Sequence, residues 1–200
     1  MNSWNDCEAI QDKPAQSLRL QLRKATRAVH TALEESWAPR TGFSSREAYR
    51  AFLFGNLRAH CEIGLIAARS RNDASETLER ARIAALCDDL GIARRGPDVT
   101  GNITADYAWG VGYVLNGSAL GASWILKTGR LQANWPRSYL TMGRAYAQAG
   151  GVREYFDRLD AQDLDAGEVI AGAHAAFAIF AAAERENAND CPPSAFLETV

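Results

Sequence analysis

The sequence predicts an all-α protein that forms a single domain. Apolar residues recur at spacings of three and four in successive segments, which is the period of a buried helix face. No stretch convincingly shows the alternation of apolar and polar residues expected of a half-buried strand. A chain of 200 residues is also long enough to bury a sizeable core within one domain.

The segments with this helical spacing are expected to be separate helices. They lie at about residues 17–37, 44–70, 75–90, 104–129, 138–148, 152–160 and 166–187. Ser17 and Thr104 can cap two of them, because a hydroxyl accepts a hydrogen bond from a free N–H at a helix start. Ser44 or Ser45 begins the second helix, with Glu47 placed for a capping box behind Ser44. Helix-breaking residues follow the segments, at Pro39, Gly42, Gly91, Trp135-Pro136 and Gly150-Gly151.

Composition and charge exclude several classes of protein. The formal net charge is −2, which gives neither a nucleic-acid footprint nor a polybasic membrane patch. No apolar run reaches the length of a membrane span, and the acidic N-terminal stretch does not resemble a signal peptide. The four cysteines are scattered without the spacing of a metal site. We therefore expect a cytoplasmic protein, with a loose lead-in at 1–15, one helical domain at 16–188 and a tail at 189–200.

The segment at 104–129 carries more glycine than a stable helix should. Each glycine within a helix costs roughly 0.5–1 kcal/mol relative to alanine. Gly110, Gly117 and Gly121 are spaced at i, i+7 and i+11, so they share one helix face. Two interpretations stay open for this bare face: another helix packs closely against it, or a flat ligand approaches the backbone there.

The pattern favours His30 as the histidine that binds a ligand, since it lies on the apolar stripe of the first helix. Glu34 stands one turn later, within reach of the imidazole, and a ligating histidine needs an acceptor for its second ring nitrogen. Arg23 stands two turns earlier on the same face. The alternative is a buried histidine with an incidental salt bridge. His60 and His174 are expected to be packed within the core or half-exposed.

Two stretches resemble motifs of the haem oxygenase family. Leu22-Arg23-Lys24-Ala25-Thr26-Arg27-Ala28-Val29-His30-Thr31-Ala32-Leu33-Glu34 is similar to its proximal-helix motif. Tyr113-Val-Leu-Asn-Gly117-Ser-Ala-Leu-Gly121-Ala122 is similar to its distal-helix motif. The resemblance covers about residues 17–187 in the right order, and the bacterial branch associated with bacteriophytochromes is the most similar. It implies a helical bundle with haem held between the two helices.

The resemblance also assigns roles to individual residues. His30 becomes the axial ligand of the haem iron, Glu34 the acceptor behind it, and Arg23 a contact of a haem propionate. Gly117 and Gly121 place bare backbone against the haem, in a motif that begins at Tyr113, which we expect at the cofactor. The remaining expected site residues are Ser118 on the distal helix and Arg153 or Arg158 as a second propionate contact.

The sequence departs from the family pattern at three distal positions. Asn116 stands where this branch often has Glu, and Ala122 replaces a glycine common in animal members. Ser118 occupies the position of the distal Asp of the animal enzymes, so no acidic side chain can organise water there. These departures leave two possibilities: a distal water network held by backbone and other side chains, or weakened chemistry.

The function implied by the resemblance is cleavage of haem, with O2 and reducing equivalents, to biliverdin, CO and ferrous iron. Electrons must come from outside, because the sequence has no flavin or nicotinamide fingerprint and no iron–sulfur spacing. A ferredoxin or flavodoxin-type reductase and a bacteriophytochrome pathway are the partners implied. Two alternatives remain: a non-catalytic haem-binding protein (carrier, buffer or sensor) on the same fold, and a helical interaction protein that has lost haem.

Overall fold

The computed structural model describes residues 17–37, 42–67, 73–93, 103–128 and 131–189. These residues form helices and no strand, which confirms the all-α prediction. The expected lead-in at 1–15 and the tail from 190 onward lie outside the described residues. The helices, in chain order, are α1 (Leu18–Trp37), α2 (Arg46–Ala67), α3 (Asp73–Leu90), α4 (Ala105–Lys127), α5 (Ser138–Gln148), α6 (Gly151–Ala161) and α7 (Ala166–Asn189).

The expected helix ends are largely confirmed. The Thr104 hydroxyl accepts a hydrogen bond from the Tyr107 N–H at the start of α4. The serine that caps α2 is Ser45, whose hydroxyl accepts from the Ala48 N–H at 3.1 Å, so the capping box expected behind Ser44 is wrong by one residue. Gly91 ends α3 with φ of 69°, a left-handed conformation that glycine adopts without steric cost.

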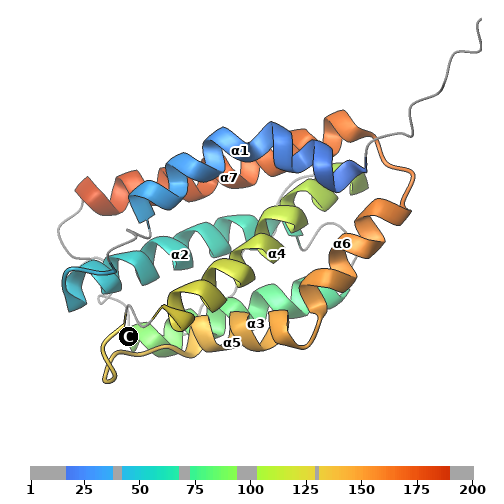
Figure 1. The fold of residues 1–200 in the computed structure, drawn as a ribbon. Coiled ribbons are helices and arrows are strands. Elements are labelled where there is room, and N and C mark those ends of the chain that lie inside the picture. The colour runs from blue at the N-terminus through green and yellow to red at the C-terminus, as the bar shows by residue number, and fades with distance from the viewer. Residues whose placement is uncertain (1–16, 38–41, 68–72, 94–102, 129–130, 190–200) are drawn as a thin grey trace, which may run out of the picture.

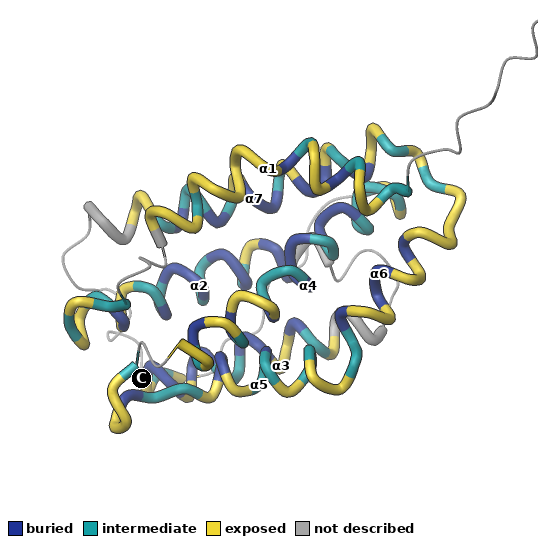
Figure 2. Tube along the Cα trace, in the orientation of Figure 1, coloured by how far each residue is buried: buried dark blue, intermediate teal, exposed yellow. Residues whose placement is uncertain are grey.

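The helices pack as a bundle around two central members, α4 and α7. Figure 1 shows α1 and α7 running side by side along one edge, with α3 and α5 along the opposite edge. Helix α7 packs against α1, α2 and α4, while α4 also packs against α5, α2 and α6. The buried positions in Figure 2 lie on the faces that these helices turn toward one another.

Two clusters of buried side chains form the core. One joins α4 and α7 to α1, α2 and α6, and includes Leu22, Val114, Phe156 and Phe177. The other joins α2, α3, α5 and the C-terminal half of α4. By length and composition alone, residues 166–186 of α7 could cross a membrane, but here α7 is the helix against which α1, α2 and α4 pack.

Helices α4 and α7 cross at a point where their backbones touch. A Cβ atom on Gly110 would overlap the Val169 carbonyl, and a Cβ atom on Gly172 would overlap the Tyr107 carbonyl. Glycine is required at both positions, because a side chain on either would push the two backbones apart. The crossing therefore fixes how α4 sits on α7.

We expect Gly110→Ala to destabilise the fold because its methyl group cannot fit at this crossing. The loss should be roughly 1–3 kcal/mol, the range for overpacking a tight contact. Chemical denaturation of the ligand-free protein measures it. Gly121→Ala is the matched control: its Cβ meets open space, and alanine favours helix, so stability should stay the same or rise. Equal losses in both variants would contradict the assignment.

Candidate functional site

The glycines of α4 have different surroundings along the helix. Gly110 packs on α7, and a Cβ on Gly112 would overlap the Tyr155 side chain. At Gly117 and Gly121 a Cβ would meet no atom within 4 Å. The first glycines therefore make close packing possible, as one interpretation expected. The later two present bare backbone to open space, where the approach of a flat ligand stays a prediction.

Helix α1, which carries His30, buries few of its residues. It lies against α7 and α6, and α4 also packs against both of these, yet α1 and α4 make few or no direct contacts with each other. Of the α1 residues whose burial is described, only Leu22 and Thr26 are buried. The two helices thus share α6 and α7 as neighbours and make few or no contacts with each other.

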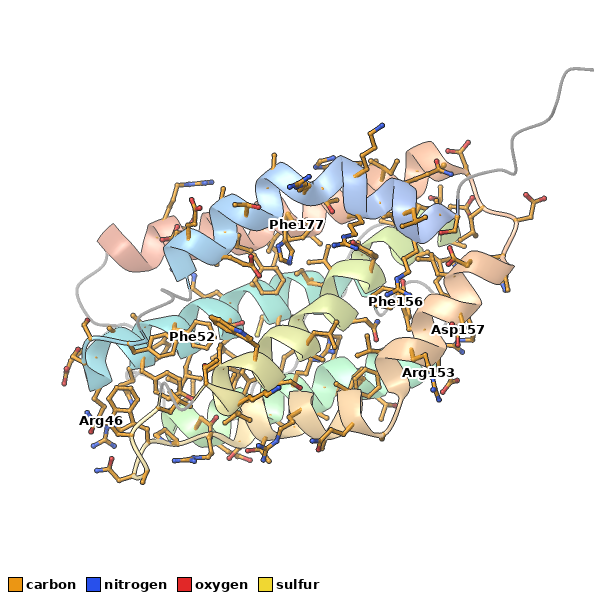
Figure 3. All side chains as sticks on the ribbon, in the orientation of Figure 1. Arg46, Phe52, Arg153, Phe156, Asp157 and Phe177 are labelled. Carbon is orange, nitrogen blue, oxygen red and sulfur yellow. The ribbon has the colours of Figure 1, made fainter. Side chains whose placement is uncertain are left out.

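His30 projects from α1 with about half of its side chain exposed, at 53%. Its Nδ1 lies 3.5 Å from the Glu34 carboxylate, and its ring meets the edge of Phe177 on α7 at a centroid distance of 5.8 Å. Phe177 is labelled in Figure 3. Among the described residues, Nε2 of His30 has no hydrogen-bond partner. The imidazole is therefore held at one nitrogen and free to bind a ligand at the other.

Large apolar side chains near these positions remain exposed. On α4, Leu120 and Trp124 share the face of Gly117 and Gly121 and are 50% and 42% exposed, and Val29 of α1 is 37% exposed. Exposed apolar residues grouped on one helix face are typical of a ligand-binding groove. An imidazole with a free nitrogen, bare backbone and apolar walls together suit a flat, apolar, iron-containing ligand such as haem.

The predicted propionate contacts lie on two different helices, α1 and α6. Arg23 is exposed on α1, on the helix face that carries His30. Arg153 and Arg158 lie on α6, where they line an open surface hollow together with Glu154 and Asp157; residues of 149–161 alone line it. Figure 3 shows Arg153 and Asp157 on the outer side of α6. The structure thus does not bring Arg153 or Arg158 together with His30.

Tyr113 is partly buried and packs against Phe156 of α6, with ring centroids 5.7 Å apart. Arg19 of α1 stacks over the Phe156 ring, and its guanidinium carbon lies 4.7 Å from the ring centroid. The backbone N–H of Arg19 also donates a hydrogen bond to the Asp160 carboxylate at 2.9 Å. These contacts tie the start of α1 to α6 and bring α1, α4 and α6 together at one end of the space.

The distal departures from the family motif face the protein interior. Ala122 is 5% exposed and packs where α4 meets Gly143 of α5, so it does not narrow the space at Gly117. The Ser118 hydroxyl donates to the Leu115 carbonyl at 2.7 Å and also reaches the Tyr139 hydroxyl on α5. Ser118 is therefore held by its own helix and by α5.

A buried polar cluster behind α4 was not predicted. His60 is fully buried, and its Nδ1 lies 2.8 Å from the Glu79 carboxylate while its Nε2 lies 2.9 Å from the Tyr139 hydroxyl. The other Glu79 oxygen accepts from Arg82, whose Nη2 has no partner in the described structure. Burial alone would raise the pKa of Glu79, but Arg82 and His60 outweigh it and the pKa is lowered.

Sequence reasoning missed this cluster because its members come from different helices. Glu79 and Arg82 form an i, i+3 ion pair on α3, and only the folded chain places that pair against His60 of α2. His60 is buried as expected, although as part of an ionic cluster rather than among apolar groups. His174 is exposed, so of the two states expected for it, packed or half-exposed, the packed one is wrong.

Comparison with known proteins identifies the fold. No family model matches the sequence, and a search of curated proteins finds no match. Among solved structures, the chain matches the haem oxygenase of Neisseria meningitidis, described in its NO- and CO-bound forms, with a TM-score of 0.60 and 24% sequence identity. The match covers 90% of this chain and 96% of that chain. The described helices, in this order and arrangement, have the haem oxygenase fold.

Proposed function

We propose that this protein is a haem oxygenase that cleaves haem, with O2 and external electrons, to biliverdin, CO and ferrous iron. One observation carries the proposal: the α4 backbone at Gly117 and Gly121 borders open space, and His30 on α1 has a free ring nitrogen. Glycine within a helix lowers its stability relative to alanine, and at Gly117 and Gly121 no neighbouring side chain or backbone explains why glycine is present. A haem lying on that backbone supplies the reason.

His30 would hold the iron through Nε2. Glu34 would accept from Nδ1–H, which fixes the tautomer that leaves Nε2 available and makes the imidazole a stronger ligand. Haem supplies the oxygen chemistry when it is bound, and the chain supplies orientation and protection from bulk water. Gly117 and Gly121 would let the α4 backbone approach the haem, because neither carries a side chain that would hold the ring away.

Arg23 is proposed to pair with a haem propionate, from a position two turns before His30. Arg23→Glu should then weaken haem binding by roughly threefold to tenfold, because an exposed charge pair contributes modestly. It should also broaden the mixture of biliverdin isomers, since the propionate contact sets the rotation of the ring. Chromatography of the products measures this, with Lys24→Glu as a neighbouring charge-reversal control. Identical isomers and affinity in Arg23→Glu would make Arg23 an ordinary solvated residue.

The electron donor is proposed to be a ferredoxin or flavodoxin-type reductase acting in the cytoplasm. The first half of α1 fits an acidic protein of this kind, because Arg19, Arg23, Lys24 and Arg27 precede its first acidic residue, Glu34. Arg153 or Arg158 remains the proposed second propionate contact. Delivery of the product to a bacteriophytochrome is the pathway that the motif resemblance favours.

A non-catalytic haem-binding protein on the same fold is the second candidate. Ser118 favours it, because its hydroxyl is engaged by Leu115 and Tyr139 and no acidic side chain stands at this position. Haemin titration followed by addition of ascorbate or a ferredoxin with its reductase tests both functions. We expect a Soret band that decays as biliverdin appears. A stable Soret band under reductant and oxygen would establish the carrier, and no Soret band would end both proposals.

A further inference from the structure

Both neighbours of Gly117 are held from α5. Asn116 is 5% exposed, and its side-chain carbonyl accepts a hydrogen bond from the Tyr146 hydroxyl at 2.8 Å. The amide of Asn116 donates to the Gly112 carbonyl one turn earlier, also at 2.8 Å. On the other side of Gly117, the Ser118 hydroxyl reaches Tyr139 of α5. Two tyrosines of one helix thus hold the residues that flank the bare backbone.

Tyr146 is itself fixed by its surroundings. Its ring lies so close to Gly151 that a Cβ atom there would overlap it. The Arg82 guanidinium lies over the ring, 6.0 Å from its centroid, and Arg82 is 2% exposed and bound to Glu79. The Gly150-Gly151 turn is thereby explained: Gly150 adopts φ of 89°, and Gly151 makes room for the tyrosine.

The open side of α4 offers nothing that could fix this segment. A Cβ on Gly117 would meet no atom within 4 Å, so no neighbour packs on the backbone at this point, whereas Leu115, Asn116 and Ala119 are buried on the other side of the helix. The side-chain bond from Asn116 to the Gly112 carbonyl adds an acceptor contact within the helix, of the kind that bends helices locally. The hydrogen bond from Tyr146 to Asn116 is therefore one of the buried contacts that hold the backbone next to Gly117.

We propose that Tyr146 is a positioning residue that acts through Asn116 to hold the Gly117 backbone at a set distance from the ligand on His30. The inference rests on the proposed function, because the ligand concerned is haem. The hydrogen bond from Tyr146 to Asn116 can be tested without haem. The hydrogen bond and the proposed function can therefore be tested separately.

Hydrogen exchange of the ligand-free full chain tests the tether. Tyr146→Phe removes the hydroxyl while keeping the ring, and the amides of residues 116–121 should exchange about fivefold faster, the factor for one net hydrogen bond of about 1 kcal/mol. Tyr49→Phe is the matched control, because its buried hydroxyl donates to the Pro136 carbonyl at 2.7 Å. Equal exchange at 116–121 in the two variants would overturn the proposal.

A second measurement uses the ferrous protein with haem and CO. Loss of the tether should broaden or split the CO stretching band in Tyr146→Phe, since the distal backbone would take several positions, while Tyr49→Phe should keep the wild-type band. A lowered melting temperature with an unchanged CO band would reduce Tyr146 to a stabilising residue and overturn the positioning role. Failure of the wild-type protein to take up haemin would instead refute the proposed function, and the exchange experiment would still decide whether the tether exists.

Discussion

His30→Ala should lose biliverdin formation by at least about a hundredfold while keeping its helical fold. The side chain is half exposed and contributes little to packing, so its removal costs little stability. Without the imidazole, the iron loses the ligand that Glu34 orients, and the haem is no longer held facing the distal backbone. Resonance Raman of the ferrous complex should lose the iron–imidazole stretch.

The histidine controls make this test specific. Both ring nitrogens of His60 are engaged by Glu79 and Tyr139, so His60 cannot replace the ligand without breaking the buried cluster. His174 is exposed, and His174→Ala should therefore leave the iron–imidazole stretch and turnover unchanged. If the iron–imidazole stretch persisted in His30→Ala and was lost in His174→Ala, the iron ligand would be His174 of α7 and the assignment would be refuted.

Gly121→Val should block turnover while leaving the protein stable and able to bind haemin. A Cβ at this position meets no protein atom, so valine adds no clash in the ligand-free fold and has a slightly better helix propensity than glycine. With haem present, the branched side chain would occupy the room that the distal backbone leaves above the ring. We expect the Soret band and the iron–imidazole stretch to persist and biliverdin to fall by about tenfold or more.

The opposite pattern would show that Gly121 serves packing. In that case Gly121→Val would lower the melting temperature as Gly110→Ala does, and the haem chemistry of the folded fraction would not change. Measuring the melting temperature and biliverdin yield on the same preparation separates the two. A destabilised Gly121→Val that still makes biliverdin at the normal rate would refute the distal-helix argument.

The sequence predicted the helices well because their signals are local. Apolar spacing, hydroxyl caps and glycine stops act within a few residues. The one capping error is the capping box placed behind Ser44, since the cap is Ser45, the other serine that the sequence offered. The shared face of Gly110, Gly117 and Gly121 was also predictable. Which glycine packs and which is bare was not, because that depends on where α7 crosses α4.

Features that join distant helices were beyond the sequence pattern. The partners of His60 come from α3 and α5, and Tyr146 reaches Asn116 from α5, so no spacing within one helix indicated them. His30 and Glu34 were predictable for the opposite reason, since they are one turn apart on one helix. Local chemistry could thus be inferred, while the buried support behind the distal helix required the fold.

A crystal structure of the protein with haemin tests the central claim most directly. The account predicts the iron bound to Nε2 of His30, the backbone of Gly117 and Gly121 against the opposite face of the ring, and a propionate at Arg23. Haem bound through His174, or a ring whose distal face lies against residues other than Gly117 and Gly121, would contradict it.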